Sequence, residues 1–147
     1  MTLKSRIGED MKAAMRARDS ERLSAIRMLL AAIQQREVDE RIELDDAQVC
    51  AVVDKLIKQR RDSISQYERA QRKDLAAREQ AEIEVLSAYL PVQATPAQIA
   101  AEIDAAIAGT GAAAVRDMGR VMGVLKPRLA GRADLSAVSA LVRERLA

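Results

Sequence analysis

The stretch Met118–Asp134, which reads MGRVMGVLKPRLAGRAD, decides how we interpret the fold. Its apolar residues recur at steps of three and four, which is the spacing of one face of an α-helix. The stretch also contains three glycines and one proline. We therefore predict a helix whose buried face is aliphatic and whose other face is irregular. The buried face consists of Met118, Val121, Met122, Leu125 and Leu129.

Two glycines, Gly119 and Gly123, stand one helical turn apart along the edge of this apolar face. A glycine costs about 1 kcal/mol relative to alanine inside a helix, so helix formation does not explain a pair of them. We interpret both as positions where another backbone, of protein or of nucleic acid, approaches closely.

Pro127 and Gly131 indicate where this helix ends. Pro127 cannot donate a backbone hydrogen bond, and its ring presses on the carbonyl group of Gly123. We therefore predict a kink or break near Lys126. Gly131, a close-approach glycine like the other two, is typical of a helix stop, and Asp134 is typical of the cap that begins the next helix.

The rest of the chain also shows helical spacing, and no strand alternation is sustained long enough to compete with it. Asp45 with Gln48, and Thr95 with Gln98, have the spacing of capping boxes. The charged segment Arg36–Leu44 lacks an apolar face and is expected to be a loop. Besides the helix above, we expect helices over about 2–17, 19–36, 45–70, 73–89, 95–109 and 135–146.

The sequence therefore predicts an all-α protein in two parts. Residues 1–91 form a four-helix N-terminal domain, and residues 92–147 form a three-helix C-terminal domain. Pro91 ends the fourth helix, and Val92–Ala94 is expected to be a hinge. With fewer than about 60 residues, the second part has little core of its own.

Side-chain orientation within the helices can also be predicted. Met15 and Leu141 are expected to face inward, as is Ile103 in the fifth helix. The basic middle of the third helix has the charge pattern of a solvated face, or of a ligand patch. Its cations are Lys55, Lys58, Arg60 and Arg61. Arg78 and Glu82 have the spacing of an ion pair within one helix.

Several functional classes are disfavoured by what the chain lacks. It has no histidine, the residue best suited to proton transfer near neutral pH and the commonest metal ligand. Cys50 is the only cysteine and lies in an apolar run, where we expect an inert packed thiol. We therefore expect no catalytic constellation, metal or cofactor. The single cysteine and the lack of an N-terminal signal pattern favour a cytoplasmic protein, and no apolar run is long enough for a membrane.

Positive charge gathers around the opening stretch, although the whole chain has a net charge of only +2. These cations could contact RNA phosphates, or they could simply complement the dipole of a helix end. Without aromatic rings, single-strand recognition by stacking is poorly supported, so a folded RNA fits better. The candidate RNA-binding residues are Arg116, Arg120, Lys126, Arg128 and Arg132.

Three runs in order resemble the bacterial YqeY-like, or GatB/YqeY domain, proteins. They are RLSAIRMLLAAIQQREVD, LIKQRRDSISQYERAQRKDLAAREQAEIEVLSAYLP and VRDMGRVMGVLKPRLAGRADLSAVSALVRERL. The similarity covers essentially the whole chain. The positions that match the motif of the family's C-terminal part are Asp117, Met118, Gly119, Val121, Met122, Gly123, Gly131, Arg132, Ala133 and Asp134.

The resemblance implies four helices followed by three, the last three being similar to the tail of the B subunit of the glutamine-dependent tRNA amidotransferase. In that enzyme the tail helps to hold the tRNA, and the chemistry takes place in a different, larger domain. Family members carry the label of a carbon–nitrogen ligase with glutamine as amido-N-donor, but no residues here match that catalytic site.

The leading hypothesis is therefore a non-catalytic helical module that binds tRNA or tRNA-linked machinery. A second hypothesis is a protein-interaction adaptor that docks, without RNA, on aminoacylation or amidotransferase proteins through the Gly119–Gly123 surface. A third is an enzyme with ligase or amidotransferase activity.

Overall fold

The structure, a computed structural model, describes all residues from 1 to 147. It contains seven α-helices, one short 3₁₀ turn and no strand, so the predicted all-α class is confirmed. The chain divides into two compact units, Met1–Leu90 and Pro91–Ala147. We describe each unit separately, as the N-terminal and the C-terminal unit.

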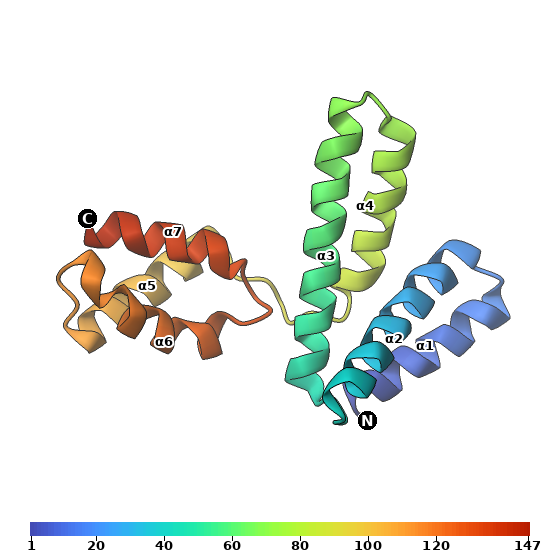
Figure 1. The fold of residues 1–147 in the computed structure, drawn as a ribbon, viewed down its shortest axis with the longest axis horizontal. Helices are drawn as coiled ribbons and strands as arrows, with labels where there is room; N and C mark the ends of the chain where they lie inside the picture. Colours follow the sequence, from blue (N-terminus) through green and yellow to red (C-terminus); the bar gives the residue numbers. More distant parts are fainter. The chain divides into compact units, whose positions relative to one another are not determined.

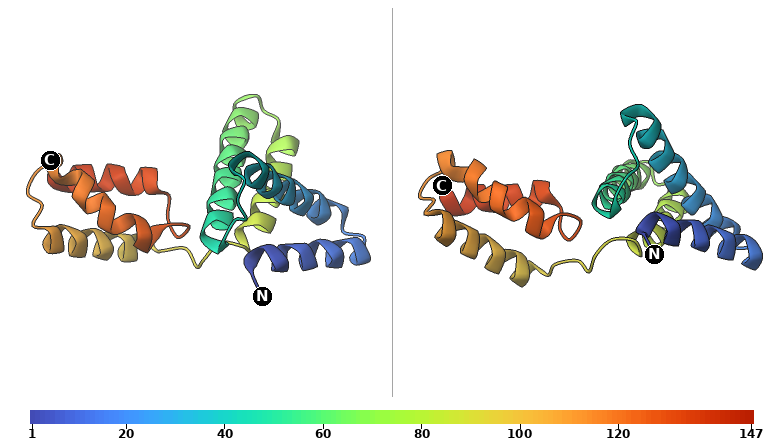
Figure 2. Two further views of the ribbon diagram at one scale, coloured as in Figure 1. Left: turned by 60° about the horizontal axis from the view of Figure 1, so that its bottom comes forward. Right: turned by 90° about the horizontal axis from the view of Figure 1, so that it is seen from below.

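The N-terminal unit consists of two antiparallel helical hairpins (Figures 1 and 2). Thr2 and Asp19 accept hydrogen bonds from backbone N–H groups at the starts of α1 and α2, and Asp45 forms the predicted capping box with Gln48 at the start of α3. The first hairpin pairs α1 (Leu3–Ala17) with α2 (Ser20–Glu40), and the second pairs α3 (Asp46–Arg69) with α4 (Lys73–Ser87).

An aliphatic core joins the two hairpins. Tyr89, which follows α4, is the only aromatic residue in it. Met15, expected to face inward, is about half exposed, because the neighbouring positions Ile7 and Ala14 already occupy the buried side of α1. The buried core residues are Ile7, Ile26, Leu29, Ile33, Leu44, Val49, Val52, Val53, Ile57, Ile83, Leu86 and Tyr89.

The loop predicted from Arg36 to Leu44 is wrong for its first half, because α2 continues to Glu40. Arg36 Nε donates to Glu40 Oε2 at 2.5 Å, which links successive turns of the helix. Glu37 accepts hydrogen bonds from Lys4 Nζ at 2.8 Å and from the backbone N–H of Leu44 at 2.9 Å. Polar contacts therefore stabilise the last part of α2. The prediction relied on the spacing of apolar residues, which does not report such contacts.

The middle of α3 contains a buried arginine where a solvated face or a ligand patch was expected. Arg60 is only 7% exposed, and its Nε donates to Glu82 of α4 at 2.8 Å. Its Nη1 donates to the carbonyl oxygen of Leu56 at 3.1 Å, and its Nη2 contacts the sulfur of Met28. The sequence predicted an ion pair between Glu82 and Arg78. In the structure, Glu82 instead pairs across the hairpin with Arg60.

The C-terminal unit consists of α5 (Pro96–Thr110), a 3₁₀ turn (Val115–Asp117), α6 (Met118–Leu129) and α7 (Leu135–Leu146). The predicted capping box begins α5, and Gly111, in the left-handed region, ends it. Packing against both α5 and α7, α6 is central to this unit. The buried residues of its core are Ile103, Ala106, Val121, Leu125, Leu129, Val138, Val142 and Leu146.

Two details of this unit differ from expectation. Of the kink or break predicted near Lys126, the break does not occur, because α6 continues through Pro127 to Leu129. Leu129 is fully buried, and its burial holds the last turn in place. Leu141, expected to face inward, is 43% exposed, since Val138 and Val142 form the buried side of α7.

We predict that Ile103→Asp unfolds the C-terminal unit. Ile103 is 1% exposed, so the substitution buries an unpaired carboxylate in an aliphatic core. The expected cost is about 3 kcal/mol or more, which a unit of this size cannot absorb. Circular dichroism should show a loss of helix, and the amide spectrum should lose the dispersion of residues 91–147. Ala101→Asp, at an exposed position of the same helix, should retain the wild-type spectrum.

We also predict that the pair Arg60–Glu82 is required as a pair. Arg60→Met should lower the free energy of unfolding of the N-terminal unit by about 3 kcal/mol, because it leaves Glu82 largely buried without its partner. The double variant Arg60→Met/Glu82→Leu should recover to within about 1 kcal/mol of wild type. Urea denaturation measures both values, with the exposed pair of Arg72 and Asp74 as the control through Arg72→Met. A double variant as unstable as the single one would contradict this account.

Candidate nucleic-acid interface

The burial of one side of α6 determines which residues its other side presents. Val121, Leu125 and Leu129 are fully buried. At 3.6 residues per turn, the side opposite to them carries six residues, all exposed. We call this set the outer face of α6, and it consists of Gly119, Arg120, Gly123, Val124, Lys126 and Pro127.

The two glycines lie within this outer face rather than along the edge of the buried one. A Cβ atom added to Gly119 or to Gly123 would meet no other atom within 4 Å. The packing of the chain itself therefore does not require a glycine at either position. What the glycines do is leave the helix backbone bare toward solvent. Gly131 has a different role, because its φ of 73° forms the turn that follows α6.

Arg120 is held at one side of the outer face by Asp117. Its Nη2 donates to Asp117 Oδ1 at 2.8 Å, and its Nη1 donates to the carbonyl oxygen of Thr110 at 3.2 Å. Asp117 also accepts from the backbone N–H groups of Ala113 and Ala114. These backbone bonds, and then Arg120, lower the pKa of Asp117 to about 2. The Arg120 side chain nevertheless remains 60% exposed.

Arg128 turns away from the outer face toward α5. Its Nε and Nη2 donate to the two oxygens of Glu102, at 2.5 and 3.1 Å. This bidentate contact lowers the pKa of Glu102 and raises that of Arg128. Arg128 is thus primarily a link between α5 and α6, although its side chain is 61% exposed.

The remaining three predicted cations differ in their surroundings. Arg132 lies in the loop between α6 and α7, where its Nε donates to the carbonyl oxygen of Val92 at 3.2 Å. Lys126, on the outer face, and Arg116, in the 3₁₀ turn just before α6, are exposed and have no hydrogen bond or ion pair in the structure. Of the five predicted cations, Arg116 and Lys126 therefore have no intramolecular partner, whereas Arg120, Arg128 and Arg132 each have one or more.

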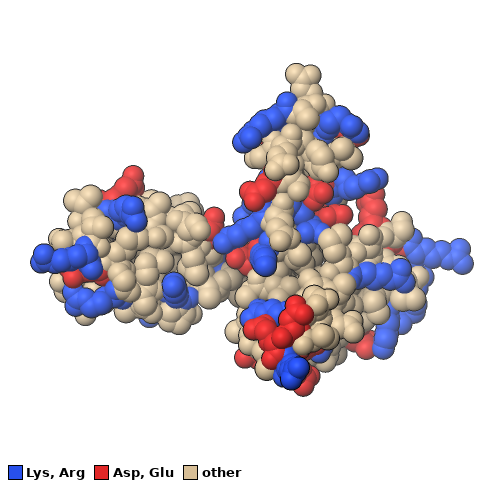
Figure 3. Space-filling view, in the orientation of Figure 1, with Lys and Arg blue, Asp and Glu red and all other residues tan.

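Charge on the surface is interspersed. In the view of Figure 3, basic side chains on the C-terminal unit are separated by uncharged surface and do not merge into one continuous patch. On the face seen in this view, a polyanion would therefore meet individual cations and not a continuous basic patch.

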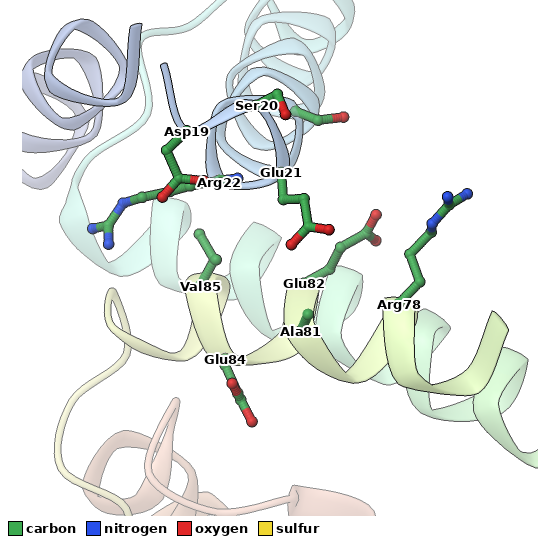
Figure 4. Close-up of a pocket in the computed structure, with 10 residues that line it drawn as sticks. Asp19, Ser20, Glu21, Arg22, Arg78, Ala81, Glu82, Glu84 and Val85 are labelled. Atoms are coloured by element: carbon green, nitrogen blue, oxygen red, sulfur yellow. Dashed lines mark hydrogen bonds between the residues drawn. The ribbon is translucent and has the colours of Figure 1, made fainter. Parts of the chain in front are cut away.

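The N-terminal unit has a hollow between the start of α2 and α4, which the sequence analysis did not identify (Figure 4). Glu21 extends toward α4 and Glu82 toward α2, with Arg78 beside Glu82. Glu82 is already bound to Arg60. Acidic and basic side chains therefore line the hollow together. No local sequence pattern indicates the hollow, because its lining residues come from two helices that are distant in the sequence.

The other chemistry-bearing features are few. Cys50 is half-buried, its Sγ lies 3.7 Å from the carbonyl oxygen of Tyr89, and burial raises the pKa of its thiol. No group of three or more cysteine or acidic side chains is arranged to hold a metal ion. None of the helices combines the length and the apolar character needed to cross a bilayer.

Several known proteins that are similar to this chain share one name. Altered inheritance of mitochondria protein 41 of Lachancea thermotolerans is 40% identical over 100 residues, which cover 67% of this chain and 52% of the relative. The proteins of the same name from Vanderwaltozyma polyspora and Eremothecium gossypii are 35% and 40% identical, over 65% and 66% of this chain and 54% and 55% of each relative. The matching region thus spans about half the length of these relatives.

These relatives correct the expected cytoplasmic location. Each of them is named as a mitochondrial protein. A lone cysteine is compatible with any reducing compartment, so it was an insufficient ground for choosing one.

The family itself is shown by a second comparison. A family model described as "Yqey-like protein" matches residues 4–146, which is nearly the whole chain and includes both units. The resemblance carried by the three sequence runs is thereby confirmed. We conclude that this chain belongs to the YqeY-like protein family.

Proposed function

We propose that this chain binds tRNA, or the machinery that handles tRNA, through the outer face of α6, and that it acts by binding rather than by catalysis. The observation that carries the proposal is a helix surface with bare backbone at Gly119 and Gly123 and a cation on either side. The similarity of the C-terminal unit to the tail of the amidotransferase B subunit supports the same conclusion.

The cations of this surface are available to phosphate groups. Lys126 and Arg116 have no intramolecular partner. Arg120 is paired with Asp117, but its guanidinium is largely exposed, and ion pairs that reach solvent are weak. A phosphate can therefore recruit the Arg120 guanidinium at low cost. Between these cations, the missing side chains let a sugar–phosphate backbone approach the helix closely.

The composition of the C-terminal unit supports a folded RNA rather than a single strand. Both tyrosines, Tyr67 and Tyr89, belong to the N-terminal unit, so the C-terminal unit has no aromatic ring on which bases could stack. Recognition by phosphate contacts, 2′-hydroxyl groups and helix shape does not need such rings. The base-paired arms of a tRNA present these groups.

A second candidate function is a protein adaptor, favoured by the same bare backbone at Gly119 and Gly123, which a partner helix could also approach. Affinity capture after nuclease treatment separates the two. A partner protein that remains bound after the RNA is removed supports the adaptor, whereas a partner that is lost with the RNA supports tRNA binding. Amide formation from glutamine by the purified chain would instead establish an enzyme.

We predict that tRNA binding depends on Arg116, Arg120 and Lys126. Changing all three to glutamine should weaken tRNA binding. It should also reduce the magnitude of the slope of the logarithm of the binding constant against the logarithm of the salt concentration by up to about 3, because each lost phosphate contact on a duplex reduces that slope by about 0.9. Filter binding of tRNA across a salt series measures this slope.

The matched control for this experiment carries the same charge change elsewhere. Lys55, Arg61 and Lys73 are exposed on α3 and α4, so their replacement by glutamine also removes three positive charges. This variant should retain the wild-type slope. Equal losses in both triple variants, or no salt-dependent binding by the wild type, would refute an RNA site at the outer face of α6.

The glycines allow a further prediction in which stability and binding change in opposite directions. Gly119→Ala/Gly123→Ala should stabilise the C-terminal unit by about 1–2 kcal/mol, because alanine favours the helix and meets no neighbour. The two methyl groups should at the same time weaken tRNA binding. Gly109→Ala, at an equally open position of α5, should change stability in the same direction and leave binding unaffected. Wild-type affinity in the double variant would show that no ligand approaches this backbone.

A further inference from the structure

Three residues of the segment that connects the two units, Val92, Gln93 and Ala94, are hydrogen-bonded to the loop after α6. The backbone N–H of Ala94 donates to the carbonyl oxygen of Arg132 at 2.8 Å, and Arg132 Nε donates back to the carbonyl oxygen of Val92 at 3.2 Å. Gln93 Nε2 donates to the carbonyl oxygen of Gly131 at 2.7 Å and to that of Pro91 at 3.1 Å. We call these bonds between Val92–Ala94 and the loop Gly131–Arg132 the linker clasp.

The loop that receives the linker is itself firmly held. The N–H groups of Arg132 and Ala133 both donate to the carbonyl oxygen of Leu129, at 2.9 and 3.1 Å. Leu129 is fully buried in the core of the C-terminal unit. With its φ of 73°, Gly131 forms the turn that brings the Arg132 backbone to the linker. The clasp therefore connects the linker to the rigid end of α6.

On the other side of the linker, the chain is fixed to the N-terminal unit as far as Leu90. Tyr89 is buried, and its hydroxyl donates to Asp10 Oδ2 at 2.6 Å. The guanidinium of Arg6 lies 5.2 Å from the centre of the Tyr89 ring and donates to the carbonyl oxygen of Ala88 at 3.3 Å. Leu90 packs against the same core. The chain is thus fixed up to Leu90 on one side and from Val92 on the other, which leaves Pro91 between them.

We propose that Val92–Ala94 is a structured arm of the C-terminal unit, and that motion between the two units pivots at Pro91, where the chain passes from Leu90 to the arm. The hinge predicted over Val92–Ala94 would have left the backbone dihedrals of three residues free. The clasp removes most of that freedom. At the junction itself, proline fixes its own φ and restricts ψ of the preceding residue to extended values. Few backbone dihedrals are therefore free to change at the pivot. Arg132 holds the arm through its hydrogen bond to Val92.

Backbone dynamics of the intact protein test this proposal. In amide-nitrogen relaxation measurements, Val92, Gln93 and Ala94 should have order parameters of about 0.85, as in the helices, and not below about 0.6, as in a flexible tether. The N–H of Ala94, which is bonded to Arg132, should also exchange with solvent more slowly than that of Val92, for which the structure shows no acceptor.

Variants distinguish the clasp from general rigidity. Arg132→Met/Gln93→Ala removes the side-chain donors of the clasp and keeps the aliphatic stem of Arg132. It should lower the order parameters of residues 92–94 and accelerate the exchange of the Ala94 amide by about threefold to tenfold. Arg128→Met, which removes a guanidinium of the same unit that does not touch the linker, should change neither quantity.

Flexible amides at 92–94 in the wild type would overturn the proposal, as would a double variant whose linker stays as rigid as the wild type. Chemical shifts of the α5 and α7 core amides report whether the unit remains folded, so a loss of rigidity confined to 92–94 supports the clasp. The measurement needs no RNA, and its result is therefore independent of the proposed tRNA binding.

Discussion

The complete burial of Val121, Leu125 and Leu129 is the constraint on which the C-terminal unit depends. These three side chains hold α6 against both α5 and α7, and they fix the rotation of the helix about its axis. Once that rotation is fixed, Gly119, Gly123 and the neighbouring cations can only face solvent. The candidate interface is therefore a consequence of core packing, since no local preference of the glycines or arginines places them outward.

The same packing determines which cations of α6 have an acidic partner and which do not. Arg128 lies on the flank of α6 next to α5 and meets Glu102, whereas Lys126 lies on the opposite flank and meets no acid. Arg120 is intermediate, because its partner Asp117 is committed mainly to backbone N–H groups. A cluster that is continuous in sequence thus becomes, in three dimensions, a small surface of a few cations around bare backbone.

In the N-terminal unit, polar contacts fix how the two hairpins are built. The Arg60–Glu82 pair joins α3 to α4 from within the core, and Glu37 joins the end of α2 to both Lys4 and Leu44. Such contacts stabilise modestly once their desolvation cost is counted, but they are specific, because each donor is satisfied in only one arrangement. They leave the hollow between α2 and α4 lined by charges that are already partly engaged.

The sequence by itself determined the helical class, the capping boxes at Asp45 and Thr95 and the buried face of α6, because each depends on residues a few positions apart. Tertiary structure alone decided that Arg60 is buried, that α6 continues past Lys126 and that Arg132 holds the linker. In each of these cases the deciding partner lies far away in the chain: Glu82 for Arg60, the α5 and α7 core for Leu129, and Val92 for Arg132. Periodicity reports which side of a helix is apolar, but only the assembled fold specifies what each side meets.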